Sequence, residues 1–218
     1  MNKTEKEMLS ILLNLKENGA IAVKAEFEAE GTRTEELLRL LELSRRAGIG
    51  IGLKIGGCEA VRDLIEAKQF GVDYVIAPMV ETPYAIKKYI EAKNKVFNYD
   101  EREDIDFLVN IETKTGFSNS IEMIDIASSK DGINGIVFGR VDFVGSQGLP
   151  LDSINEENIT KSCIEIGSKC KQSNLDFVVG GGVSDISVAP LLTIKNNYLT
   201  RFETRKIIFE SSAIEGKR

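Results

Sequence analysis

Apolar segments of strand length alternate with amphipathic segments of helix length along most of the chain. This alternation is typical of repeated βα units, which form a parallel sheet. The expected strands begin near Ala20, Gly48, Asp73, Lys95, Phe107, Gly132, Leu175 and Tyr198. The expected helices cover residues 4–15, 35–46, 59–70, 83–92, 120–129, 156–171 and 185–192, and residues 100–104 form a short connection. About eight strands separated by helices predict a compact (β/α)8 TIM barrel with an N-terminal helix. An open, doubly wound sheet is the alternative architecture.

We expect the whole chain, residues 1–218, to form a single domain. With 218 residues and 42% hydrophobic content, it is long enough for one substantial core and short for two. No composition shift, low-complexity run or Pro-rich linker marks an internal boundary. The length is near the lower limit for a TIM barrel, so we expect abbreviated helices or one helix supplied by a neighbouring subunit.

The first two predicted strands each have one apolar face and one polar or charged face. On the first strand, Lys24, Glu26 and Glu28 alternate with apolar residues, and Lys54 alternates with apolar residues on the second. In a barrel, the charged face would point inward or toward the C-terminal mouth, where active sites of this fold lie. Burying such charges unpaired would cost several kcal/mol each, so they should be paired with one another or surround a metal. A purely structural ion-pair network is the alternative, and the functional interpretation is preferred.

Two further acidic residues stand where predicted strands end in polar or glycine-rich chain. Glu112 follows the strand that begins near Phe107, and Asp142 ends the segment 135–142. Carboxylates held at neighbouring strand ends supply the hard oxygen ligands that Mg²⁺ prefers and leave positions open for water and substrate. The pair therefore predicts a divalent metal site. For Asp142 taken alone, a helix N-cap or turn role is an equally good interpretation, because aspartate often accepts hydrogen bonds from nearby backbone N–H groups.

Three segments of the sequence carry a resemblance to a known family. Residues 109–113 (Val-Asn-Ile-Glu-Thr) and 135–143 (Gly-Ile-Val-Phe-Gly-Arg-Val-Asp-Phe) resemble the paired strand motifs of the HpcH/HpaI aldolase and citrate lyase β-subunit family, and residues 73–81 resemble its preceding strand and Pro-containing loop. The resemblance covers most of residues 48–148. Members of that family are metal-dependent TIM barrels that make or break a C–C bond beside the 2-oxo group of pyruvate-like acids, or cleave related acyl-CoA thioesters. The resemblance implies that Glu112 and Asp142 bind Mg²⁺ or Mn²⁺.

The resemblance also implies which residues contact the substrate. The family usually places an Arg at the end of an early strand to hold the substrate carboxylate, and Lys54 is the nearest equivalent here. Gly139 and Arg140 of the second motif are expected to bind substrate together with Lys54. Lysine offers a point charge in place of the bidentate fork of arginine, so this chain departs from the family pattern at that position.

A second departure concerns proton transfer. The aldolase branch of the family uses a His-containing arrangement, whereas this chain has no histidine. Glu26 is our candidate for the base that accepts the proton of the substrate hydroxyl, and Glu28, Lys24 or a metal-bound water are the alternatives.

The expected function is that of a divalent-metal-dependent C–C lyase, of the aldolase or citrate lyase type, acting on a 2-oxo acid or related carboxylate through a metal-stabilised enolate. Two other interpretations stay open. A metal-independent aldolase would use Lys24 or Lys54 as a Schiff-base nucleophile. A catalytically degenerate barrel would only bind a metabolite, and the missing histidine favours that possibility.

Charge and composition narrow the choice of partners. A formal net charge of −6 and a pI near 5.0, with scattered Lys and Arg, argue against nucleic acid and anionic membranes. The N-terminus lacks the apolar core of a signal peptide and no run approaches the length of a membrane span, so we expect a cytoplasmic protein. The three cysteines lack the Cys-x-x-Cys spacing of a zinc or redox site. We expect a small-molecule carboxylate as substrate and, from the resemblance, a homo-oligomer.

The glycine run Gly180–Gly182 and the later Arg201 leave phosphate binding open. Loops after the seventh and eighth strands often hold phosphate in TIM barrels, whereas a short glycine run is more often an ordinary tight turn.

Overall fold

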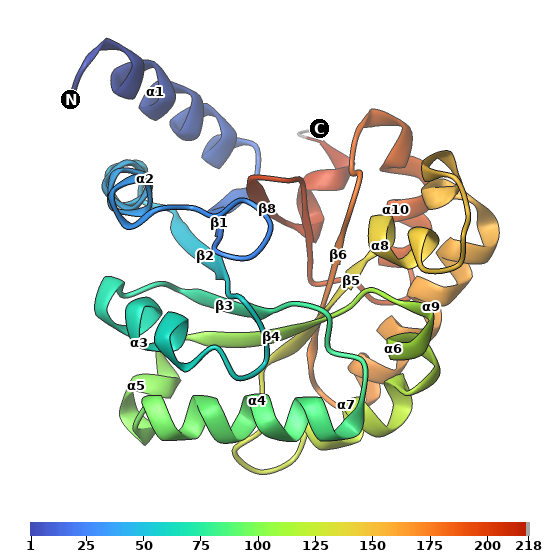
Figure 1. Cartoon of the computed structure of the whole chain (residues 1–218). Coiled ribbons are helices and arrows are strands. Elements are labelled where there is room, and N and C mark those ends of the chain that lie inside the picture. The colour runs from blue at the N-terminus through green and yellow to red at the C-terminus, as the bar shows by residue number, and fades with distance from the viewer. Residues whose placement is uncertain (217–218) are drawn as a thin grey trace.

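Eight strands close into a barrel in the order of the chain in the computed structural model, which describes residues 1–216 (Figure 1). Neighbouring strands from the first to the seventh run parallel, and the eighth is antiparallel to both the seventh and the first. The strands are β1 (Ala20–Glu26), β2 (Gly50–Lys54), β3 (Tyr74–Ala77), β4 (Asp106–Ile111), β5 (Gly135–Gly139), β6 (Asp176–Gly180), β7 (Arg201–Glu203) and β8 (Ile207–Glu210). The expected eight-stranded α/β barrel with an N-terminal helix is confirmed.

Helices surround this barrel, and most lie close to their expected positions. The α-helices are α1 (Lys3–Glu17), α2 (Thr34–Ala47), α3 (Val61–Phe70), α4 (Pro83–Val96), α5 (Tyr99–Glu103), α6 (Lys114–Ser118), α7 (Ser120–Ala127), α8 (Arg140–Gly145), α9 (Glu157–Gln172) and α10 (Val188–Lys195), and 3-10 turns cover Leu151–Asn155, Asp185–Ser187 and Ser211–Glu215. None of the helices within residues 1–216 is long and apolar enough to cross a membrane.

One predicted strand is wrong. Lys95 lies in α4, which begins at Pro83, where the Thr82 side chain accepts a hydrogen bond from the N–H of Ala85, and continues to Val96. The helix extends beyond its expected end at residue 92 because Ala92 and Lys93 lie on its buried side. The eighth strand is instead β8, which forms a hairpin with β7, so an antiparallel strand replaces the last parallel strand of a standard (β/α)8 barrel.

The core has two parts that follow from the alternation along the strands. Side chains on the outer faces of the strands, such as Ile51, Val109 and Phe138, pack beneath the helices in one large cluster. Inside the barrel, a small cluster fills the centre with Ile76, Leu108, Val137 and Val178.

An ion-pair cluster lies at the N-terminal end of the barrel. The Arg201 guanidinium lies 2.9 Å from Asp106 and 2.6 Å from Asp176, the first residues of β4 and β6, and stacks over the Tyr74 ring at 4.8 Å. Gly180 ends β6 at the opposite end of the barrel. The structure therefore does not bring Arg201 together with the glycine run as a phosphate site.

Candidate functional site

A network of charged side chains, all buried except the partly buried Glu28, lies at the carboxyl ends of four strands. We call it the mouth network; its residues are Lys24, Glu26, Glu28, Lys54, Glu112 and Glu203. The Lys24 ammonium lies 2.7 Å from Glu203 and 3.4 Å from Glu26. The Lys54 ammonium lies 3.3 Å from Glu28 and 3.6 Å from Glu112. Each ammonium thus lies between two carboxylates, and the network holds two more carboxylates than ammonium groups.

Glu112 is the most firmly held carboxylate of this network. It is only 2% exposed, and it accepts hydrogen bonds from the Met79 backbone N–H at 2.9 Å and from the Asn110 side-chain amide at 2.7 Å. Met79 adopts a φ of 50°, which is uncommon for a residue other than glycine and is typical of functional loops. Burial raises the pKa of Glu112, whereas the positive charge of Lys54 and both hydrogen bonds lower it, and the raising effect is larger.

Gly139 makes room for Glu112. A Cβ atom at Gly139 would lie 2.6 Å from Glu112 Oε2 and 2.7 Å from Glu112 Cβ, far inside ordinary contact distance. The glycine at the end of β5 therefore allows the glutamate after β4 to lean across the neighbouring strand. Contact between Gly139 and substrate stays a prediction, whereas the geometry gives this glycine a clear role through Glu112.

Asp142 lies in a helix and not at the end of a strand. The expected strand 135–142 ends at Gly139, and Asp142 lies in the first turn of α8, exposed to solvent. No hydrogen bond from the described residues involves its carboxylate, so it is not a local cap. Burial of Glu112 makes the largest contribution among the effects that shift the pKa of Glu112, and the negative charge of Asp142 makes the smallest.

The donor set around Glu112 fits a divalent cation. Each Glu112 oxygen accepts a single hydrogen bond and keeps a second lone pair, and the neighbouring Asn110 Oδ1 is buried without a hydrogen-bond partner in the described part of the chain. Within residues 1–216, no group of three or more Cys, Asp and Glu side chains is arranged to hold a metal. Mg²⁺ is commonly bound by one or two carboxylates and completed by water and substrate, so Glu112 and Asp142 are sufficient candidates.

Lys24 remains protonated in its pairing with Glu203. Burial lowers the pKa of Lys24, but the charges of Glu203 and Glu26 and their hydrogen bonds outweigh burial and raise it above its usual range. Glu26 itself is 8% exposed and lies in register with Lys54 on the next strand. Within residues 1–216, Lys24 is the only ion-pair partner of Glu26 at the mouth.

Arg140 is directed away from the mouth network. Its guanidinium is buried and donates to the carbonyls of Gly180 at 3.2 Å and Gly181 at 3.0 Å, and to the Asn155 side chain at 3.0 Å. Burial lowers the pKa of Arg140. In this arrangement Arg140 fastens the start of α8 to the loop after β6, and Gly181, at a φ of 81°, allows the two backbones to approach closely.

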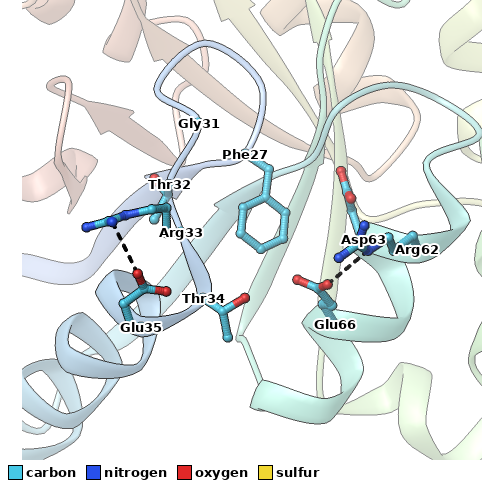
Figure 2. A pocket seen from close by; sticks show the side chains of 9 residues that line it. All are labelled: Phe27, Gly31, Thr32, Arg33, Thr34, Glu35, Arg62, Asp63 and Glu66. Atoms are coloured by element: carbon cyan, nitrogen blue, oxygen red, sulfur yellow. Dashed lines mark hydrogen bonds and ion pairs between the residues drawn. The ribbon is translucent and has the colours of Figure 1, made fainter.

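A surface cavity of about 430 Å³ opens beside the mouth, between the β1–α2 loop and α3 (Figure 2). Phe27 projects into it, and its two arginines are already paired, Arg33 with Glu35 at 3.3 Å and Arg62 with Glu66 at 3.2 Å. None of the residues predicted from the sequence to bind metal or substrate lines this cavity.

Three residues of the site escaped the sequence analysis as functional candidates. Met79 supplies a backbone donor, which no side-chain pattern reveals, although the preceding Pro78 marks a special loop. Asn110 alternates with apolar residues on β4, and that polar position inside a strand was the available signal. Glu203 lies at the end of the three-residue strand β7, which is too short to show alternation.

Comparison with known proteins agrees with this geometry. The closed barrel of eight strands surrounded by helices places this chain in the TIM-barrel class. The sequence profile of the HpcH/HpaI aldolase/citrate lyase family matches residues 29–181, and the chain belongs to this family. No curated protein matches the chain significantly.

Several solved structures share the fold at low sequence identity. An HpcH/HpaI aldolase from Desulfitobacterium hafniense DCB-2 superposes with a TM-score of 0.71 at 10% identity, covering 90% of this chain and 82% of the other. An HpcH/HpaI aldolase/citrate lyase family protein from Burkholderia cenocepacia J2315 gives 0.69 at 14% identity, with 90% and 83% covered. Citrate synthase SbnG gives 0.68 at 16% identity, with 90% of each chain covered.

Proposed function

We propose that this protein is a divalent-metal-dependent C–C lyase that cleaves a 4-hydroxy-2-oxo acid, or a related carboxylate, to release pyruvate or a pyruvate-like product. The observation that carries the proposal is that Glu112 and Asp142 follow the neighbouring strands β4 and β5 at the C-terminal mouth, with Lys54 Nζ 3.6 Å from Glu112. Family membership supports the reaction type, because the family consists of aldolases and lyases.

Glu112 and Asp142 would hold Mg²⁺ or Mn²⁺. Such a cation, when bound, supplies positive charge that stabilises the enolate form of the product. The buried position of Glu112 and its two fixed hydrogen bonds pre-organise this side chain, so little reorganisation is needed when a ligand binds.

Lys54 and Glu26 would act on the substrate directly. The Lys54 ammonium would bind the substrate carboxylate through its charge. It would exchange part of its pairing with Glu28 and Glu112 for this contact. Glu26 would accept the proton of the C4 hydroxyl while the C3–C4 bond breaks. The electron pair of that bond becomes the enolate, the C4 fragment leaves as an aldehyde, and C3 of the enolate then takes up a proton to give the 2-oxo acid.

Metal-dependent release of pyruvate tests this proposal. Wild-type protein is assayed with a panel of 4-hydroxy-2-oxo acids and malyl- or citramalyl-type thioesters, in Mg²⁺ or Mn²⁺ and again in EDTA. Glu112→Gln keeps the size of the side chain but removes its charge, and we expect turnover and metal affinity to be lost while the fold is retained. The matched control Glu122→Gln changes an exposed glutamate of α7 and should behave as wild type. Equal turnover in Glu112→Gln and wild type would remove Glu112 from the site.

A Schiff-base mechanism is a distinguishable alternative. Its nucleophile has to be a neutral amine, yet the pKa of Lys24 is raised by Glu203 despite burial, and this disfavours Lys24 in that role. Borohydride treatment in the presence of pyruvate should leave the protein mass unchanged. A covalent adduct on Lys24 or Lys54 would replace the metal-dependent mechanism, and metal binding without turnover of any substrate would indicate a barrel that only binds a metabolite.

We also propose that the chain self-associates. Helix α1 exposes Met8 and Ile11, and both line an apolar cavity of about 650 Å³ that α1 shares with α2, β1 and β8. Contiguous exposed apolar surface of this kind often marks an interface. Light scattering should give a mass that is a multiple of 24.1 kDa. A monomer at assay concentration would contradict this proposal.

A further inference from the structure

Two adjacent glycines form a floor between two carboxylates at the mouth. Gly139 ends β5 and Gly180 ends β6, and the two residues are partners in the parallel pairing. A Cβ at Gly139 would lie 2.6 Å from Glu112 Oε2, and a Cβ at Gly180 would lie 2.8 Å from Glu203 Oε1. Glu112 and Glu203 therefore lean toward this floor from its opposite sides. Because neighbouring strands are roughly 5 Å apart, the two carboxylates lie within about 10 Å of each other, a span that suits an acid of four to six carbons.

Glu203 has a buried carboxylate oxygen that lacks a hydrogen-bond partner in the described part of the chain. The residue is 5% exposed, and its Oε1 accepts a hydrogen bond from Lys24 Nζ at 2.7 Å. Its Oε2 is buried and has no hydrogen-bond partner in residues 1–216. Buried polar atoms are nearly always paired, because leaving one unpaired forfeits its hydration without replacement. A ligand that donates a hydrogen bond would satisfy this oxygen.

The charge around Glu203 restricts the chemistry of such a ligand. Lys24 is shared between Glu203 and Glu26, so one ammonium faces two carboxylates on this side of the mouth. A second carboxylate on the ligand would add repulsion here. A neutral hydroxyl group would donate a hydrogen bond to Glu203 Oε2 without adding charge.

We propose that Glu203 is a specificity-determining residue whose Oε2 accepts a hydrogen bond from a hydroxyl group at the end of the substrate opposite its carboxylate. The site consequently favours acids whose far end is neutral and hydroxylated over acids that end in a methyl group or a second carboxylate. The assignment rests on the proposed lyase function for its reaction, while Glu26 remains the proton acceptor. Within the described chain, no residue donates a hydrogen bond to Glu203 Oε2.

Three matched five-carbon compounds test the assignment: 4,5-dihydroxy-2-oxopentanoate, 4-hydroxy-2-oxopentanoate and 4-hydroxy-2-oxopentanedioate, which differ only in carrying CH2OH, CH3 or a carboxylate at C5. In Mn²⁺-loaded wild type we expect kcat/KM to be about tenfold higher for the dihydroxy compound than for the methyl compound, the size of one charge-assisted hydrogen bond. The dicarboxylate should be the poorest substrate.

Glu203→Gln should abolish this ranking. Glutamine keeps the length of the side chain and an oxygen for Lys24, but places an amide donor where a charged acceptor stood. We expect the preference for the hydroxylated compound to fall to about twofold or less and turnover of the dicarboxylate to rise relative to the others. Gly180→Ala provides a second route, because its methyl group would displace Glu203 without removing charge. The control Glu210→Gln, at the exposed end of β8, should retain the wild-type ranking.

Binding measurements separate this inference from the proposed function. Dissociation constants of the same three compounds are measured by calorimetry on EDTA-treated wild type and Glu203→Gln, where no cleavage is needed. One outcome is that the EDTA-treated wild type binds the three compounds in the expected order while the Mn²⁺-loaded wild type turns over none of them. That result would retain the role of Glu203 and reject the lyase function. Turnover with no ranking, or a ranking unchanged in Glu203→Gln, would overturn the role of Glu203 and leave the lyase function standing. Neither binding nor turnover of any compound would overturn both.

Discussion

A single methyl group at Gly139 should disable the site through Glu112. In Gly139→Ala, the new Cβ would lie 2.6 Å from Glu112 Oε2 and 2.7 Å from Glu112 Cβ. Favourable contacts between such atoms begin near 3.5 Å, so Glu112 has to move by roughly 0.8 Å. Because the close contact includes Cβ as well as the carboxylate, rotation of the side chain alone cannot relieve it.

The size of the effect follows from what Glu112 loses when it moves. A shift of this size breaks or lengthens the hydrogen bonds from Met79 and Asn110, now 2.9 Å and 2.7 Å. Overpacking of a well-packed site typically costs about 1–3 kcal/mol in the free energy of unfolding. Misplacement of a functional group by about 1 Å can reduce turnover by roughly a hundredfold. We therefore expect a loss of about tenfold to a hundredfold in kcat/KM and a clear loss of Mn²⁺ affinity.

Urea unfolding, Mn²⁺ binding by electron paramagnetic resonance, and pyruvate release measure these three effects. Gly145→Ala is the matched control, because no heavy atom lies within 4 Å of the added methyl group at the end of α8. It should change the free energy of unfolding by no more than about 1 kcal/mol and leave turnover unchanged. Wild-type Mn²⁺ affinity in Gly139→Ala would refute the argument that this glycine provides clearance for Glu112.

Two further predictions concern residues remote from the mouth. Arg201→Met leaves two partly buried aspartates without their cation and should lower the free energy of unfolding by about 2–4 kcal/mol. Arg205→Met breaks an exposed ion pair and should lower it by less than about 1 kcal/mol. Equal losses for the two variants in urea unfolding would contradict this contrast. Burial, together with the charge of Arg102, lowers the pKa of Lys93 to about 8, so the folded chain disfavours the Lys93 ammonium. The contribution of Lys93 to stability is therefore lost as pH falls through 8, and wild type should gain stability relative to Lys93→Met as pH rises past 8; a difference independent of pH would exclude that shift.

The alternation of side chains determined much of this structure in advance. The period of two along β1 and β2 placed Lys24, Glu26 and Lys54 on the inner face, because successive strand residues point to opposite sides. The cost of burying charge then required that they be paired. The helix-length segments fixed most of the helices, and their order with the strands specified a barrel.

Other features depended on contacts between segments distant in sequence. The short apolar segment Val96-Phe97 next to Lys95 fits either a strand or the end of a helix, and packing of α4 against the barrel decided for the helix. The hairpin that makes β8 antiparallel was also hidden, because β7 and β8 have only three and four residues, too few to display a pattern.

The site shows the same division between sequence and tertiary structure. Local sequence identified Glu112 as a candidate ligand, since an acidic residue directly after a buried strand lies at the mouth of a barrel. It could not reveal Glu203, whose pairing with Lys24 joins residues 179 positions apart. It also misplaced Asp142 at a strand end, because the helix α8 starts directly after Gly139. Sequence periodicity reports which face of an element a side chain occupies, but only closure of the barrel decides which faces meet, and that closure brought these carboxylates together.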